Sequence, residues 1–173
     1  MSPRLTGVKV VLVDDDQDVL EAMDTAMKAE GAITRPVADG NQAVDVCQEE
    51  PPDLVILDMM LPKRSGFLVL EKIKGYEEAP IVIMLTANEG RRHQAYAESL
   101  GVDAYMLKPV PLERLLSKSI ELLALRHARK TSGTPPQSPT ATATPTQASA
   151  SKPGEEAATP RRKSAGPGGG KST

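Results

Sequence analysis

The sequence predicts a doubly wound α/β sandwich, in which helices cover both faces of a parallel β-sheet. Five apolar, strand-like runs alternate with five segments of helical periodicity along the first 126 residues. Several of the runs are continuously apolar, as strands buried on both faces are. Strict alternation of strands and helices requires right-handed crossovers between parallel strands, and these place helices on both faces of the sheet.

The expected strands differ in how deeply the sheet should bury them. The central stretch is Asp53–Pro62, which contains a continuous apolar run and then breaks at proline. The second run is weaker and contains Pro36, which cannot donate a hydrogen bond to a neighbouring strand, so this strand belongs at a sheet edge. The strands are expected at Val8–Val13, Ala32–Val37, Leu54–Leu57, Ile81–Leu85 and Ala104–Leu107.

The helices are predicted from apolar residues that recur three or four positions apart between the strands. Gly31, Gly75 and Gly101 end three of them, because glycine is favoured just past a helix end. The pair Pro51-Pro52 stops another. The helices are expected from Asp16 or Gln17 to Gly31, from Asn41 to Glu49, from Phe67 to Gly75, from Arg91 to Leu100, and from Leu112 to about Arg126.

The charge distribution argues against a nucleic-acid-binding surface on the folded part. The chain has 173 residues and a net charge of -2, and the part before Thr131 holds 16 basic and 21 acidic side chains. An acidic surface repels phosphate backbones, so we expect no direct DNA binding. Cys47 is the only cysteine, which favours a reducing compartment. No apolar run approaches the roughly 18 residues of a membrane span, so we predict a cytoplasmic protein without a membrane partner.

The composition changes at about Thr131. Residues 131–173 contain no aromatic residue but 7 of the 15 prolines and 6 of the 13 glycines. Such a segment cannot bury enough apolar surface to offset its ordering entropy. We therefore predict a folded domain at residues 1–130, with a core at about 6–126, followed by a disordered tail. Ala165–Ser172 fits a relaxed phosphate-loop pattern, but it lacks the flanking strand and helix of a real phosphate loop.

Polar side chains follow the carboxyl ends of four apolar runs. Asp14 and Asp15 follow the first run, Asp58 the third, Thr86 the fourth and Lys108 the fifth. In open parallel sheets, ligands bind outside the carboxyl ends of the strands. We therefore expect these five side chains to converge on one site.

The expected site has the chemistry of magnesium-dependent phosphoryl transfer. Crowded carboxylates repel one another, and a divalent cation removes that penalty. Mg²⁺ prefers oxygen ligands and typically uses one or two carboxylates together with phosphate oxygens. A lysine and a hydroxyl supply a charge and a hydrogen-bond donor for a phosphoryl group. One carboxylate can then act as the nucleophile and form an acyl phosphate.

Four motifs in this order resemble the receiver (CheY-like) domain of two-component response regulators. They are VLVDDD at 11–16, LDMMLP at 57–62 with Gly66 after it, LTA at 85–87, and YMLKP at 105–109. The resemblance covers about residues 6–126. It implies a flavodoxin-like fold with the strand order 2-1-3-4-5, which places the strand that contains Pro36 at an edge.

The resemblance also implies roles for the residues at the site. Asp58 matches the residue that accepts a phosphoryl group from a sensor histidine kinase or a phosphotransfer protein. Asp14, Asp15 and Asp58 match the Mg²⁺ ligands, together with the backbone carbonyl of Met60. Lys108 matches the lysine that contacts the phosphoryl group.

Further positions match the parts of the family that respond to phosphorylation. Thr86 matches the hydroxyl that moves onto the phosphoryl group, and Tyr105 matches the aromatic residue that then turns inward. Packing at a half-buried edge explains Tyr105 equally well. The bond to Pro109 is expected to be cis. The region from Arg91 to Arg126 matches the surface that contacts a downstream protein target or forms a phosphorylation-dependent dimer.

Two positions in the family influence how fast the acyl phosphate hydrolyses. They match Met60 and Asn88, which follow Asp58 and Thr86 by two residues each. An apolar Met60 hinders the attacking water, so we predict a fairly long-lived phosphorylated state.

The acidic stretch Asp14–Asp18 admits a second interpretation as the start of an EF-hand. The sixth position is Val19, where glycine is required, and the twelfth is Thr25, where glutamate is required. We therefore interpret Asp16 and Asp18 as acidic residues at the start of a helix.

Two other functions remain as alternatives. An aspartyl-phosphate hydrolase of the haloacid dehalogenase type would use D-x-D-x-T/V at the first strand, but Asp18 occupies the T/V position and the chain leaves no room for a substrate cap. A receiver-shaped scaffold would bind partners without phosphorylation, but it is expected to lack an acid or the lysine. No second apolar-periodic region follows Arg126, so we expect a stand-alone receiver that catalyses only its own phosphorylation and dephosphorylation.

Overall fold

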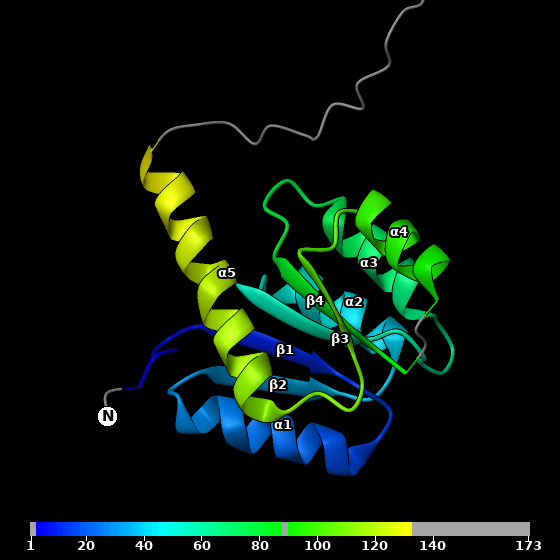
Figure 1. Cartoon of the computed structure of the whole chain (residues 1–173), viewed down its shortest axis with the longest axis horizontal. Coiled ribbons are helices and arrows are strands. Elements are labelled where there is room, and N and C mark those ends of the chain that lie inside the picture. The colour runs from blue at the N-terminus through cyan, green and yellow to red at the C-terminus, as the bar shows by residue number, and fades with distance from the viewer. Residues whose placement is uncertain (1–2, 88–89, 133–173) are drawn as a thin grey trace, which may run out of the picture. The chain divides into compact units, whose positions relative to one another are not determined.

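The computed structural model describes residues 3–87 and 90–132, which form alternating strands and helices (Figure 1). The elements are β1 (Lys9–Val13), α1 (Gln17–Ala29), β2 (Ile33–Val37), α2 (Gly40–Glu49), β3 (Leu54–Asp58), α3 (Gly66–Lys74), β4 (Ile81–Thr86), α4 (Arg91–Ser99), β5 (Ala104–Leu107) and α5 (Leu112–Ser132). The chain divides into two units, residues 1–135 and 136–173, and only the first contains described residues.

The five strands form one parallel sheet in the order β2-β1-β3-β4-β5. The predicted fold class and strand order are therefore confirmed. Leu12 of β1 pairs with Pro36 on one side and with Ile56 of β3 on the other. Because β2 is the outermost strand, Pro36 lies at an edge, where its missing N–H removes no bond from the interior of the sheet.

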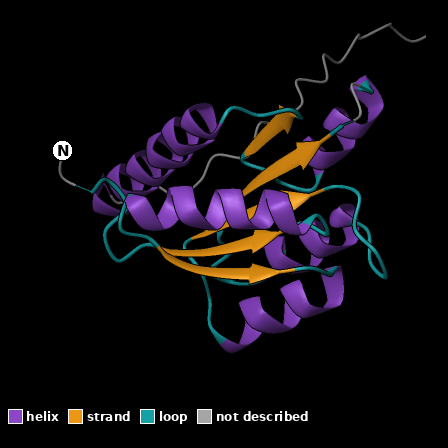
Figure 2. Ribbon diagram, turned by 90° about the horizontal axis from the view of Figure 1, so that it is seen from below, coloured by secondary structure: helices purple, strands orange, loops and turns teal. Residues whose placement is uncertain are grey.

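Helices cover both faces of this sheet (Figure 2). Helices α1 and α5 bury their apolar residues on one face, and α2, α3 and α4 bury theirs on the other. Every residue of β3 and β4 is buried. Two-sided burial explains why these strands are continuously apolar in the sequence. None of the described helices combines the length and the apolar composition that a membrane span requires.

The element boundaries agree with the sequence prediction to within one or two residues, except at the end of α5. This helix continues to Ser132, beyond the expected end at Arg126 and into the first two residues of the predicted tail. The prediction followed the apolar stripe, which ends at Leu123. Residues 127–132 continue the helix because they contain neither glycine nor proline, and because the Ala, Arg and Lys among them are good helix formers. The rest of the tail, including Ala165–Ser172, lies outside the described residues.

The segment before β1 is part of the packed chain. The side chain of Leu5 is only 1% exposed and belongs to the core on the α1 and α5 face. Its backbone N–H donates to the carbonyl of Glu30 at 2.8 Å, and Arg4 forms an ion pair with the Glu30 carboxylate. The segment before β1 is therefore attached to the end of α1.

Candidate functional site

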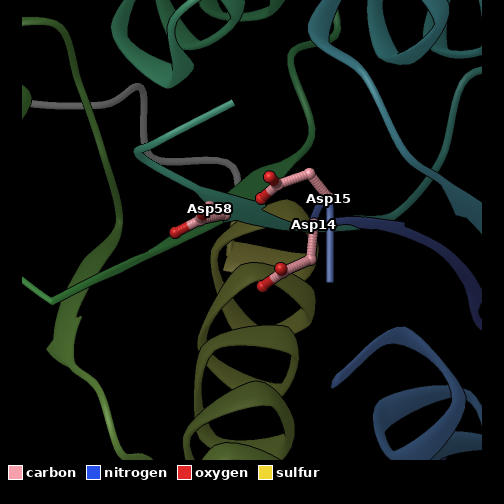
Figure 3. A group of neighbouring side chains, drawn as sticks. All are labelled: Asp14, Asp15 and Asp58. Carbon is pink, nitrogen blue, oxygen red and sulfur yellow. The ribbon is translucent and has the colours of Figure 1, made fainter. Parts of the chain in front are cut away.

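Three carboxylates meet at the carboxyl edge of the sheet (Figure 3). Asp14 and Asp15 directly follow β1, and Asp58 is the last residue of β3. Their nearest carboxylate oxygens all lie within 4.8 Å of one another. Asp14 and Asp58 are buried, with exposed fractions of 1% and 4%, whereas Asp15 is exposed. The structure therefore brings together the three acids that the sequence predicts.

Lys108 supplies the positive charge of the site. Its Nζ lies 2.6 Å from Asp14 Oδ2 and 3.1 Å from Asp58 Oδ1. Burial lowers the pKa of Lys108, but its contacts with the two carboxylates outweigh burial, so the pKa lies above its ordinary value. The ammonium group therefore stays charged at neutral pH and links the ends of β1 and β3.

Burial also controls the ionisation of Asp58. Removal from water raises the pKa of this carboxyl group, although contacts with Lys108 oppose the change. The nearby Asp14 carboxylate raises the pKa further, and the backbone N–H of Met60 lowers it. A carboxylate that is costly to keep ionised gains from a nearby cation and is also a better nucleophile than an ordinary surface aspartate.

Backbone hydrogen bonds hold the strand ends in register at the site. The N–H of Asp14 donates to Val37 O at 3.3 Å, and the N–H of Lys108 donates to Thr86 O at 2.7 Å. These bonds continue the ladder past the last paired residues. The positions of the site's side chains are therefore set by the sheet and not by loops.

Gly66 lets the first turn of α3 approach the end of β3. A Cβ at this position would lie 2.8 Å from Met59 Cα and even closer to the carbonyl oxygen of Asp58. Real Cβ atoms do not approach backbone atoms so closely, so a side chain would have to displace the strand end. The glycine that follows the LDMMLP motif is thus explained by the close contact with the backbone of Asp58.

Thr86 and Tyr105 both contact Met59. The hydroxyl of Thr86 donates to Met59 Sδ at 3.5 Å, and the hydroxyl of Tyr105 donates to the same sulfur at 3.9 Å. Thr86 is fully buried and Tyr105 is partly buried. Sequence reasoning did not single out Met59, because within Asp53–Pro62 it reads as one more apolar residue after a buried run.

The remaining predicted residues lie around this site. The side chain of Met60 is 66% exposed, and the Lys108–Pro109 peptide bond is cis. Within the predicted contact surface from Arg91 to Arg126, Tyr96 of α4 and Leu107 of β5 are 49% and 44% exposed. Asn88 lies outside the described residues.

Asp16 belongs to the helix start and not to the carboxylate group. Its Oδ1 accepts hydrogen bonds from the backbone N–H groups of Asp18 at 3.0 Å and Val19 at 3.3 Å. This is N-cap geometry, and it confirms the interpretation of Asp16 as a capping residue. Its own N–H donates to Asp14 Oδ1 at 3.0 Å, which fixes the orientation of the Asp14 carboxylate.

Comparison with known families excludes one of the two alternative functions. A sequence model of the response regulator receiver domain matches residues 10–120. The chain belongs to the response regulator receiver family. Receivers are signalling domains of two-component systems and not turnover enzymes, so the match excludes the aspartyl-phosphate hydrolase.

Solved structures of other receivers resemble this receiver over nearly their whole length. A CheY-like receiver domain from Methanospirillum hungatei is 26% identical, with a TM-score of 0.69, and the match covers 72% of this chain and 99% of that one. The receiver of a putative Luxo repressor protein from Vibrio parahaemolyticus is 26% identical, with a TM-score of 0.67 and coverage of 73% and 97%. The N-terminal receiver domain of Klebsiella pneumoniae RstA is 27% identical, with a TM-score of 0.62 and coverage of 66% and 97%.

The donor atoms of this receiver fit a hard divalent cation. Asp14, Asp15 and Asp58 offer carboxylate oxygens within reach of one ion, and such an acidic triad is typical of the Mg²⁺ site of receivers. Asp15 is exposed, so one side of the triad is open to solvent and to a hydrated ion.

Proposed function

We propose that Asp58 accepts a phosphoryl group from a sensor histidine kinase or a phosphotransfer protein. One observation carries this proposal: the Lys108 ammonium contacts the carboxylates of both Asp14 and Asp58. A cation, two buried acids and a third exposed acid at one sheet edge form a site for a dianionic group and a divalent cation together. Family membership supports histidine kinases as the class of partner.

The residues of the site divide the chemistry between them. Asp14, Asp15 and Asp58, with the backbone carbonyl of Met60, would hold Mg²⁺, which neutralises the carboxylates and the phosphoryl oxygens when it is bound. A carboxylate oxygen of Asp58 forms a bond to phosphorus while the bond from phosphorus to the imidazole nitrogen of the donor breaks. The imidazole keeps the electron pair of that bond and takes up a proton. Lys108 contacts an equatorial phosphoryl oxygen and offsets its charge.

Phosphorylation then changes a protein-interaction surface. It replaces the single negative charge of the Asp58 carboxylate with an acyl phosphate that carries about -1.5 to -2 charges. Thr86 and Lys108 are attracted to the new oxygens, and Tyr105 turns inward as the Thr86 hydroxyl leaves. The affected surface is the region from Arg91 to Arg126, which binds a downstream protein target or a second copy of the chain. Its exposed apolar side chains, such as Tyr96 and Leu107, support this part of the proposal.

A groove beside Lys108 is suited to the phosphoryl donor. It has a volume of about 490 Å³ and lies between α1 and the start of α5, with Met23, Val110 and Leu112 among its lining residues. A protein donor must cover the surface around Asp58 to deliver its imidazole, whereas a small phosphodonor needs no such surface. Leu112→Asp should therefore slow phosphorylation by a histidine-phosphorylated partner at least tenfold, because it places a charge in an apolar contact. Its rate with acetyl phosphate should stay unchanged, and equal slowing with both donors would contradict this assignment.

The proposed reaction is tested by incubation with Mg²⁺ and acetyl phosphate, followed by intact mass measurement. The expected result is one added phosphoryl group in the wild type and none in Asp58→Ala. Chelation of the metal should also abolish the addition. An unmodified wild type at saturating donor and Mg²⁺ would contradict the proposal, and an Asp58→Ala variant with full function in cells would favour the phosphorylation-independent scaffold.

Two finer points stay predictions from the sequence. One is that this receiver acts without a covalently attached output domain, and the other is that it is cytoplasmic. The size and location of the protein in its native cells, measured by immunoblotting of cell fractions, test both.

A further inference from the structure

The side chain of Met59 lies between the two residues that are proposed to respond to phosphorylation. Its Sδ accepts the Thr86 hydroxyl at 3.5 Å and the Tyr105 hydroxyl at 3.9 Å. Met59 is only 4% exposed and belongs to the core on the α2, α3 and α4 face, against which Tyr105 also packs. A single buried sulfur therefore joins a residue at the end of β4 to one in β5.

The backbone of Met59 is fixed at both of its polar groups. Its N–H donates to Leu85 O at 2.9 Å, and its carbonyl accepts from Gly66 N at 3.0 Å. Any response of Met59 is therefore confined to its side chain. An unbranched thioether with three rotatable bonds adapts easily to small changes in its neighbours.

The strength of the two acceptors determines how easily Thr86 changes partner. A thioether sulfur is a weak acceptor, whereas a phosphoryl oxygen is charged and forms much stronger hydrogen bonds. Thr86 is fully buried, so no water accepts a hydrogen bond from its hydroxyl while it changes from the sulfur to the phosphoryl oxygen. The weak acceptor keeps the hydroxyl ordered before phosphorylation, and little free energy is lost when the hydroxyl breaks this hydrogen bond.

We propose that Met59 is a positioning residue that holds the Thr86 and Tyr105 hydroxyls in their unphosphorylated arrangement and sets the cost of switching. This inference rests on the proposed function, because it assigns to Met59 a part in the response to a phosphoryl group at Asp58. When Thr86 turns to the phosphoryl oxygen, the sulfur loses one of its two donors. The Met59 side chain is then no longer held by Thr86, so it can rotate and let Tyr105 move inward.

The test uses beryllium fluoride with Mg²⁺ as a stable imitation of the phosphoryl group, as in the BeF3-activated receiver of RstA. Met59→Leu conserves volume but removes the sulfur acceptor. It weakens only the unphosphorylated arrangement, so the apparent affinity for beryllium fluoride should rise roughly fivefold, the effect of about one modest hydrogen bond. Titrations followed by NMR of the Thr86 methyl group and the Tyr105 ring report both affinity and switching.

Two further variants separate the hydrogen bond from packing. Met84→Leu changes another fully buried methionine in the same core cluster and should leave the affinity within about twofold of wild type. Thr86→Val removes the donor while keeping the shape of the side chain. In that background, Met59→Leu should raise the affinity less than it does in the wild type, because only the contact of the Tyr105 hydroxyl with the sulfur is left to remove.

The outcomes distinguish this inference from the proposed function. Equal affinities of wild type and Met59→Leu, with clear binding by both, would overturn the role of Met59 alone. The same holds if Met59→Leu raises the affinity equally in the Thr86→Val background, since the effect would then not depend on the Thr86 hydroxyl. A wild type that neither binds beryllium fluoride nor gains a phosphoryl group would overturn the proposed function and the role of Met59 with it.

Discussion

At the scale of single residues, the site holds together charged groups whose burial costs folding free energy. Two buried carboxylates lie beside one lysine, and removal from water raises the pKa of Asp58. Such a buried group adds no stability to the fold unless a bound metal ion neutralises the remaining negative charge of the carboxylates. The carboxylates that would bind the cation therefore destabilise the metal-free fold. The stability of the protein should respond to pH and to substitution of Asp58.

Asp58→Asn should stabilise the metal-free protein at neutral pH. The pKa of Asp58 is raised in the folded state, so the stability it contributes is present below its ordinary pKa of 3.8 and is lost as pH rises through the folded pKa. Asparagine does not ionise, so the variant does not lose this stability as the pH rises. Lys108 keeps its contact with Asp14. Urea unfolding in a chelator at pH 7 and pH 3.5 should show the gain at pH 7 only.

The control for this prediction is the exposed Asp45 of α2. Asp45→Asn should change the free energy of unfolding by no more than about 0.5 kcal/mol at either pH. A destabilised Asp58→Asn at pH 7 would show that the carboxylate is needed for folding and would contradict the account of its burial.

Met60 should influence how long the phosphorylated state lasts. Its side chain is exposed beside the site, where it can cover the path of an attacking water. Met60→Asn replaces it with an amide that can orient water, so loss of the phosphoryl group should be faster. Intact mass measured over time after removal of the donor gives both rates. If the wild type loses its phosphoryl group as fast as the variant, methionine does not protect the acyl phosphate.

The acids and the lysine could be predicted from the sequence, but the contact of Met59 could not. Asp14, Asp58 and Lys108 follow apolar runs, and the rule for parallel sheets is enough to bring them together. Side-chain directions past a strand end depend on where the pleat stops and on the neighbouring backbone. The sequence therefore gives no sign that the sulfur of Met59 lies between Thr86 and Tyr105.

At the scale of elements, the contact between α3 and the end of β3 positions Asp58. Gly66→Ala should destabilise the protein by about 1–3 kcal/mol, because its Cβ would collide with the backbone of Asp58 and Met59. The rate of phosphorylation by acetyl phosphate should fall as well, since the strand end must move. Urea unfolding and intact mass measure the two effects.

Gly75, at the other end of α3, provides a matched control. A Cβ there would meet its nearest atom, Lys72 O, at 3.4 Å, which is ordinary contact, and the residue has right-handed helical geometry. Gly75→Ala should therefore be close to neutral in stability and in phosphorylation. Equal effects of the two substitutions would contradict a special role for the Gly66 contact.

Elements were predicted well where burial determines the sequence pattern and less well where it does not. The fully buried β3 and β4 are continuously apolar up to their last residues, and Pro36 correctly indicated an edge strand. The end of α5 was placed too early, because its last turns bury no apolar stripe. The last turns of α5 are helical because of the helix propensity of their residues, and the spacing of apolar residues does not reveal this.

At the scale of the whole molecule, the segment before β1 adds a pH-dependent contact with the end of α1. Hydrogen bonds from Arg4 hold the pKa of the Glu30 carboxyl at about 2. Its contribution to stability is therefore present above its ordinary pKa of 4.5 and is lost as pH falls through the folded pKa.

Removal of the Arg4 guanidinium should bring the pKa of Glu30 closer to its ordinary value. In Arg4→Gln, NMR titration should show a Glu30 pKa raised from about 2 toward 4.5, although the backbone N–H of residue 4 still donates to the carboxylate, and the protein should lose less stability between pH 4.5 and pH 2 than the wild type does. Glu50, whose pKa is lowered by its contact with Lys9, is the internal control and should titrate as before. A Glu30 pKa that stays at about 2 in the variant would mean that Arg4 is not the cause.

The fold as a whole places three acids at one edge, and we propose that only Asp58 among them becomes phosphorylated. The most direct measurement is to phosphorylate the protein with acetyl phosphate and Mg²⁺, reduce the acyl phosphate with borohydride, and map the resulting homoserine by peptide sequencing. We expect homoserine at position 58 and unmodified side chains at Asp14 and Asp15. Homoserine at either of those positions, or at none of the three, would contradict this expectation.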